Sequence, residues 1–155
     1  MYGSADEPKK PGGIALSKDS RKGRAVLRRL ISEEDFRARD AAANSFNREF
    51  QQLSEELAFA TVWSRPGLDW KTRSLLCIAM LTALGHWPQL KMHANSALNN
   101  GATVEELKEL VLHMSVYCGL PAAAQAGQAI EDVITRRGLV LSPIVLESEP
   151  DLSSP

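Results

Sequence analysis

The sequence predicts an all-α protein, a compact bundle of about six helices. Three observations lead to this fold class. Apolar residues between the two ends recur at helical spacing, proline and glycine divide them into helix-sized segments, and no useful stretch alternates as a strand would. The length of 155 residues, with 44% hydrophobic and 24% charged residues, is that of one ordinary globular domain.

Charge and hydropathy exclude several classes of protein. Eighteen Lys and Arg against nineteen Asp and Glu give a formal charge of −1, so no overall basic field points to nucleic acid. The longest nearly apolar run, residues 74–85, is well short of the ~20 residues of a membrane-spanning helix. Cys77 and Cys118 lie in apolar stretches and are expected to be reduced thiols. The first residues lack a secretory signal pattern, so we expect a cytoplasmic protein without membrane partners.

The two ends differ from the middle in composition. Residues 1–22 are basic and interrupted by glycine and proline, which predicts a flexible arm, either solvated or binding an anionic partner. Residues 139–155 contain three prolines and no periodicity and are expected to form a tail. The helical domain is therefore expected at residues 23–138, beginning with a short helix near residues 24–31.

Two longer helices follow in the first half. Phe46, Phe50, Leu53 and Leu57 form one stripe at i, i+4, i+7 and i+11, which predicts a helix over residues 40–62. An Arg-Pro-Gly sequence at 65–67 ends it. The next helix, residues 70–84, is apolar on nearly every side, so we expect it to be buried either centrally or between subunits.

Three more helices are marked by their end signals. The helix at residues 87–99 has Pro88 in its first turn and is followed by Gly101. Residues 103–106 have the capping-box pattern that opens a helix ending before Gly119. The last helix, residues 121–136, has a face of alanines that permits close approach to a neighbour. The alanine face and the apolar helix at 70–84 together suggest an oligomer.

One helix face carries the candidate chemistry. His86, Gln89 and His93, at i, i+3 and i+7, lie within an arc of about 60° on the helix at 87–99. Two imidazoles could ligate a metal, but this face offers no third ligand, so no metal site is expected. His93 is either a site residue or a core histidine that donates to a carbonyl.

Other side chains also invite a functional interpretation. Trp63 and Arg65 stand together at a helix end, where the guanidinium could hold an anion or the tryptophan could simply anchor a turn. Arg73 lies early in an apolar helix, as a carboxylate clamp or a salt-bridge partner. Tyr117 could offer its hydroxyl to a ligand. The sequence has no phosphate-binding glycine loop, no Gly-x-Ser-x-Gly and no Cys-x-x-Cys.

These motifs, in order, resemble the carboxymuconolactone decarboxylase family, in particular its gamma-carboxymuconolactone decarboxylase branch. The resemblance covers residues 24–133 and rests on the segments Trp-Ser-Arg-Pro-Gly-Leu at 63–68, Thr-Arg-Ser-Leu at 72–75, Ile-Ala-Met-Leu at 78–81, His93 with Asn-Asn-Gly at 99–101, Glu-Glu-Leu-Lys-Glu at 105–109 and Tyr-Cys-Gly-Leu-Pro-Ala-Ala at 117–123. It implies an alkylhydroperoxidase-like helical subunit that forms homotrimers or homohexamers. The peroxidases of that superfamily use Cys-x-x-Cys-x-x-x-His. Here His86 and Gln89 occupy the cysteine positions, which disfavours thiol peroxidase activity.

The resemblance implies a cofactor-independent decarboxylation of gamma-carboxymuconolactone, or a close small lactone acid, to an enol-lactone and CO2. This reaction belongs to aromatic-acid breakdown by the beta-ketoadipate pathway. His93 would be the proton donor, with Arg73 and Arg65 as carboxylate clamps and Trp63 excluding water. Gln89 would complete the catalytic group, and His86 and Tyr117 would contact the substrate.

Gln89 departs from this branch, which commonly has glutamate at that position. An amide can form hydrogen bonds but cannot shuttle a proton. A diverged paralogue with another reaction, such as an isomerase, dehydratase or decarboxylase of a tailoring pathway, is therefore one alternative. A non-catalytic oligomeric binding protein is another.

Overall fold

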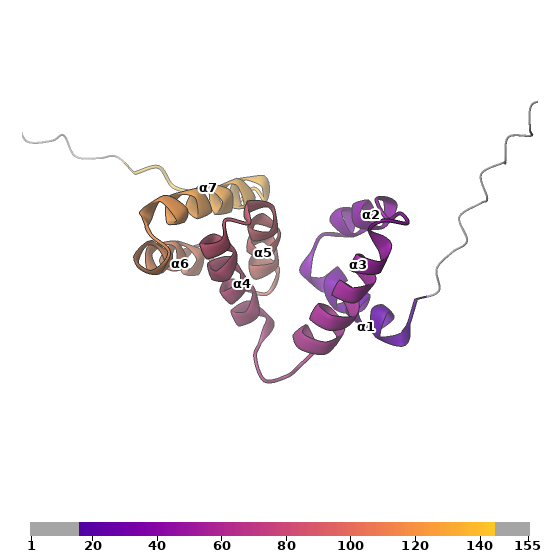
Figure 1. Ribbon diagram of the computed structural model, residues 1–155. Coiled ribbons are helices and arrows are strands. Elements are labelled where there is room, and N and C mark those ends of the chain that lie inside the picture. Colours follow the sequence, from indigo (N-terminus) through magenta and orange to yellow (C-terminus); the bar gives the residue numbers. More distant parts are fainter. Residues whose placement is uncertain (1–15, 145–155) are drawn as a thin grey trace, which may run out of the picture. The chain divides into compact units, whose positions relative to one another are not determined.

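The computed structural model describes residues 16–144, and over that range the chain is helical without strands (Figure 1). The prediction of an all-α fold is confirmed. The chain divides into two compact units, of which residues 16–70 and 71–144 are described. The first unit contains α1 (Lys18–Leu30), α2 (Glu33–Ala41), α3 (Arg48–Ser54) and the π-helix η1 (Glu55–Trp63). The following helices are α4 (Trp70–Leu84), α5 (Trp87–Asn99), α6 (Val104–Tyr117) and α7 (Leu120–Arg136).

Helix α1 packs closely on η1 within the first unit. The hydroxyl of Ser17 accepts the backbone N–H of Ser20 and caps the start of α1. At Gly23 the two backbones meet so tightly that an added Cβ would lie 1.8 Å from the carbonyl oxygen of Glu55. Helix α1 begins at Lys18, within residues 1–22 that were expected to form an arm. The rest of that arm up to residue 15 lies outside the described residues.

The predicted helix over residues 40–62 is wrong in its first part, and α2 was not predicted. Ser32 caps α2 by accepting the N–H of Asp35 at 3.0 Å, and the ring of Phe36 is buried. Asn44 then interrupts the chain, because its side-chain oxygen accepts the N–H groups of Phe46 and Asn47. Such side-chain bonds to nearby backbone compete with helical ones, so α3 begins only at Arg48.

In α3 and at the first residue of η1, the polar side chains, and not the apolar ones, are directed into the first unit. Glu55 is completely buried, and Arg48 is 9% exposed. The apolar stripe on the other side lies outside: Phe46 is 94% exposed and Phe50 73%. The amphipathic pattern is therefore inverted relative to the core of this unit.

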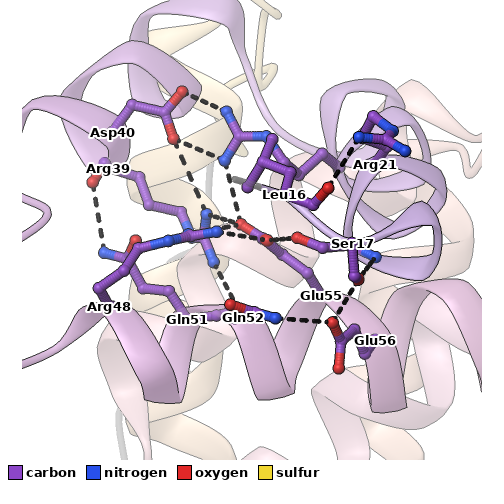
Figure 2. Close-up of polar contacts among 12 residues, drawn as sticks. Leu16, Ser17, Arg21, Arg39, Asp40, Arg48, Gln51, Gln52, Glu55 and Glu56 are labelled. Atoms are coloured by element: carbon purple, nitrogen blue, oxygen red, sulfur yellow. Dashed lines mark hydrogen bonds and ion pairs between the residues drawn. The ribbon is translucent and has the colours of Figure 1, made fainter. Parts of the chain in front are cut away.

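A cluster of ion pairs explains the inversion. Glu55 accepts hydrogen bonds from Arg39 at 2.7 Å, from Arg24 at 3.0 Å and from both terminal nitrogens of Arg48 at 3.3 Å (Figure 2). Ser20 also donates to Glu55, and Arg24 pairs with Asp40. We call Glu55, its three arginines and Asp40 the Glu55 cluster. A buried charge is tolerated only when it is paired and hydrogen-bonded, as Glu55 is here.

The π-helix η1 continues directly from α3 and ends at Trp63. Its buried residues are Glu55, Phe59, Ala60 and Trp63. The carbonyl of Trp63 accepts the indole N–H of Trp70 at 3.1 Å, and the guanidinium of Arg29 lies 4.1 Å from the ring centroid of Trp70. The helix ends just before the Arg-Pro-Gly sequence, as predicted.

The second unit has its own apolar core, built from α4 to α7. Ile78, Leu90, Leu107 and Met114 are at most 1% exposed, and the alanine face of α7 is buried against them. The predicted capping box of α6 is confirmed, since Thr103 accepts from Glu106 N–H and the Glu106 carboxylate accepts from Thr103 N–H.

Helix α4 has the predicted bounds but not the predicted central burial. Only Ser74, Ile78 and Thr82 are buried, whereas Met80 and Leu84 are 56% and 66% exposed. The prediction that this helix is buried centrally in the chain's own core is therefore wrong. Its burial between subunits stays a prediction. No helix within residues 16–144 has the length and hydropathy to cross a bilayer. Of the predicted tail at 139–155, residues 139–144 are exposed, and the others lie outside the described residues.

Candidate active site

Helix α5 carries Gln89 and His93 of the predicted polar face, whereas the third member, His86, is the non-helical residue that precedes the helix. His86 precedes the first turn of α5 and is exposed, as is Gln89, whereas His93 is half-buried. His93 stands one turn from Leu90 and Ala97, which are completely buried. The face therefore runs from solvent at its N-terminal end into the unit at His93.

Burial controls the protonation of His93. Removal of the imidazole from water lowers its pKa from 6.5 to about 4. Nδ1 has essentially no solvent exposure. His93 is consequently neutral at neutral pH when no ligand is bound, which suits a group that becomes charged only when a negative charge arrives.

The pKa of His93 predicts a loss of stability in mild acid. The unfolded chain binds a proton at this histidine below pH 6.5, and the folded chain does so only near pH 4, so unfolding is favoured as the pH falls through that interval. The loss should reach about 3 kcal/mol at pH 4. Urea unfolding of wild type and His93→Gln between pH 7.5 and 4 measures it. Parallel pH dependences for the two proteins would contradict this account.

Two further polar residues extend the face along α5 and a third meets it from α4, and sequence reasoning did not assign them to the site. At 100° per residue, Ser96 and Asn100 fall within about 60° of His93 on α5. Ser96 is completely buried, and the side-chain amide of Asn100 donates to Ser74 Oγ of α4 at 3.0 Å. Ser74 is also completely buried. A part-buried hydrogen bond thus joins the C-terminal end of the α5 face to α4.

Arg73 lies next to Ser74 in α4 and is half-buried. Its positive charge acts on Cys77 one turn later. Burial raises the pKa of the Cys77 thiol, and the charge of Arg73 opposes that rise. The thiol is therefore protonated and unsuited to nucleophilic attack. Arg73 places a positive charge on α4, the helix that the Asn100 bond joins to α5.

The remaining predicted site residues lie elsewhere. Trp63 and Arg65 belong to the first unit, with Trp63 buried in its core and Arg65 exposed on the following turn. Tyr117, at the end of α6, is 76% exposed, and its ring lies 4.7 Å from that of His113. Within the second unit, then, Gln89 and His93 stand one turn apart on α5, His86 is the cap residue just before that helix, and Tyr117 lies on the surface.

Metal-binding side chains do not assemble in the part of the chain that the structure describes. Across residues 16–144 no group of three His, Cys, Asp or Glu side chains is placed to hold a metal ion. The α5 face offers an imidazole, amides and hydroxyls, and Arg73 of α4 offers a guanidinium in the same unit. These groups can bind a carboxylate and move a proton.

Comparison with known proteins decides the family. The model of the carboxymuconolactone decarboxylase family matches residues 48–132, which is more than half of the chain. The chain belongs to the carboxymuconolactone decarboxylase family. The matched residues include α3 and η1 of the first unit. In the second unit they include α4, α5, α6 and most of α7.

Two relatives of this family member carry assigned activities. The 4-carboxymuconolactone decarboxylase of Acinetobacter baylyi (strain ATCC 33305 / BD413 / ADP1) is 42% identical over 119 residues, which are 77% of this chain and 89% of the relative. The nitrosuccinic acid decarboxylase npaB of Metarhizium robertsii (strain ARSEF 23 / ATCC MYA-3075) is 46% identical over 84 residues, 54% of this chain and 59% of the relative. Both are named as decarboxylases, and the chain is an enzyme of the carboxy-lyase class.

Proposed function

We propose that this enzyme removes CO2 from gamma-carboxymuconolactone, or from a close small lactone acid, without a cofactor. The observation that carries the proposal is the half-buried His93 on a polar face, in a chain 42% identical to a 4-carboxymuconolactone decarboxylase. The proposal places the enzyme in aromatic-acid breakdown and in the cytoplasm, where its two half-buried thiols stay reduced.

The reaction makes two demands on the site. When the bond from the ring carbon to the carboxylate breaks, its electron pair moves through the ring double bond onto the lactone carbonyl oxygen. A proton must then be added to a ring carbon to give the enol-lactone. The site therefore needs hydrogen-bond donors or cations for the developing oxyanion, and one acid positioned at the ring.

His93 serves as that acid in the proposal. It is neutral in the free protein because burial lowers its pKa to about 4. A bound substrate brings two carboxylates, and negative charge close to an imidazole favours its protonated form. Binding of the substrate thus raises the pKa of His93 and leads to its protonation. After His93 has donated this proton to the ring, it takes another from water.

Arg73 and the amide of Gln89 complete the proposed site in the second unit. Arg73 binds the carboxylate that is retained, as a guanidinium does through paired hydrogen bonds. Gln89 and His86 contact the lactone, and neither needs to titrate if His93 takes its proton from water. Trp63, Arg65 and Tyr117 stay predictions of substrate contact, and a change of KM in their alanine variants would test them.

The pH dependence tests the role of His93. The parameter kcat/KM reports the free enzyme, in which His93 has a pKa of about 4, whereas kcat reports the charged complex. We expect kcat/KM to fall about tenfold per pH unit between pH 5 and 7, while kcat stays level to a higher pH. Steady-state assays across this range check the expectation. A kcat/KM that stays flat or rises would contradict a proton-donating His93.

A second substrate class is favoured by the relative from Metarhizium robertsii, which is named for nitrosuccinic acid. A carboxylate on a carbon that also bears a nitro group loses CO2 to leave a nitronate. That anion also places its charge on oxygen and needs one proton at carbon. Gln89, where this branch commonly has glutamate, fits such a change of substrate. Comparing kcat/KM for CO2 release from the lactone with kcat/KM for CO2 release from the nitro acid distinguishes the two candidates.

A further inference from the structure

The π-helix η1 is a feature of the first unit that the proposed chemistry does not explain. A π-helix closes its turns between residues i and i+5, which is rare, and where it occurs it often marks a functional site. The side chain of Thr61 follows this winding, because its hydroxyl donates at 2.8 Å to the carbonyl of Glu56, five residues earlier. In an α-helix a threonine hydroxyl reaches the carbonyl three or four residues earlier. The nine residues of η1 are therefore wound more widely than those of α3.

Both ends of η1 are held in place. At its first residue, the carboxylate of Glu55 is held by the three arginines of the Glu55 cluster (Figure 2). The backbone of Glu55 is held by its close contact with Gly23. At the last residue, Trp63 is buried, its carbonyl accepts the indole N–H of Trp70, and its ring lies 6.4 Å from that of Phe59. The helix thus joins a fixed carboxylate to a packed indole ring.

The winding between these two residues decides the direction of the Trp63 ring. Trp63 follows Glu55 by eight residues. Eight residues complete about 2.2 turns of an α-helix but only about 1.8 turns of a π-helix, which has nearly one residue more in each turn. With Glu55 held in place, α winding would therefore turn Trp63 by about 140° around the helix axis.

We propose that Glu55 is a positioning residue for substrate binding, which acts through the π winding of η1 on the direction of Trp63. Two of its arginines come from α1 and α2, so turning the start of η1 would break their bonds and leave buried charges without compensation. Arg39 of α2 also donates to the carbonyl of Gln51 at 3.2 Å, in the last turn before η1. The inference rests on the proposed function, with Trp63 as a substrate contact.

Arg39→Gln is the main variant, because it loosens Glu55 and leaves two positive and two negative charges in the Glu55 cluster. Glu55→Gln is the stronger change and is compared where it folds. The control is Glu56→Gln, since that carboxylate bonds Ser17 and Gln52 instead of the arginines.

Fluorine NMR of 5-fluorotryptophan-labelled protein shows whether Trp63 moves. The three tryptophans give three ¹⁹F signals, which Trp→Phe variants assign. We expect the Trp63 signal to shift in Arg39→Gln and Glu55→Gln and to stay in place in Glu56→Gln. The signal of Trp87, in the second unit, should stay in place in all three. An unmoved Trp63 signal in folded Arg39→Gln would overturn the proposal.

Kinetics test whether the effect passes through Trp63. On whichever of the lactone and the nitro acid the wild type decarboxylates, Arg39→Gln and Trp63→Phe should each raise KM about tenfold and change kcat less, since a binding contact is weakened and His93 is intact. The double variant should keep the KM of Trp63→Phe alone, because changes that act through one group do not add. Multiplied effects on KM, or a shifted Trp63 signal with an unchanged KM, would overturn the proposal.

The two measurements separate this inference from the proposed function. A wild type that decarboxylates neither acid contradicts the proposed function. The ¹⁹F signals need no substrate, and they still test the positioning of Trp63 by Glu55.

Discussion

Replacement of His93 by alanine should reduce kcat for decarboxylation by 10²- to 10⁴-fold. That range is the contribution of a positioned proton donor. The loss should be in kcat more than in KM, because the proton is transferred only after the carbon–carbon bond has weakened, whereas the substrate carboxylates are bound by other groups. Steady-state kinetics on the lactone measure both parameters.

The matched control is His113→Ala. His113 is an exposed histidine on α6, in ring contact with Tyr117, and is not on the α5 face. Its variant should retain turnover within a few-fold of wild type. Far-UV circular dichroism checks that both variants fold. Unchanged kcat in folded His93→Ala would remove His93 from the mechanism.

Replacement of Glu55 by glutamine should destabilise the protein by about 3–5 kcal/mol, the usual result of removing one partner from a buried ion pair. The amide keeps the shape of the side chain but leaves three guanidiniums around a neutral group (Figure 2). Burial alone would raise the pKa of Glu55, but hydrogen bonds from Ser20 and the three arginines outweigh burial and lower it to about 2. The free energy of unfolding in urea measures the change.

Glu56→Gln is the control for this variant. Glu56 is the next carboxylate in η1, bonded to Ser17 and Gln52 away from the arginines, and its replacement should have a much smaller effect. The stabilisation from Glu55 should also disappear in acid. Its folded pKa lies below the unfolded value of 4.5, so its contribution is complete above pH 4.5 and is lost as the pH falls toward 2. Equal effects of the two variants would contradict the role of the Glu55 cluster.

Local signals made much of the second unit predictable. The ends of α5 and α6 follow from Pro88, the Thr103 capping box and the glycines at 101 and 119, which adopt positive φ values. The same kind of signal, Ser32 with Asp35, marks α2, but its segment has only Phe36 to give it an apolar face. Where several local signals agreed, the sequence predicted the bounds closely.

Long-range pairing explains what the sequence could not predict. Hydropathy predicts that the Phe50 side of α3 is buried. The structure buries Glu55 instead, because Arg24 and Arg39, 31 and 16 residues earlier, donate to its carboxylate. Periodicity within one helix contains no information about such partners. In the candidate site the α5 face was predictable from spacing, but the bond from Asn100 to Ser74 was not, since Asn100 also fits a simple helix end.

The most direct test of the proposed function is CO2 release by the purified chain from gamma-carboxymuconolactone, with the nitro-substituted succinate as the comparison. The proposal predicts one CO2 and one enol-lactone per lactone consumed, without added metal or cofactor, and a higher kcat/KM for the lactone than for the nitro acid. A kcat/KM that favours the nitro acid would move the enzyme to the second substrate class. No CO2 from the lactone, by a folded protein, would contradict the proposed function.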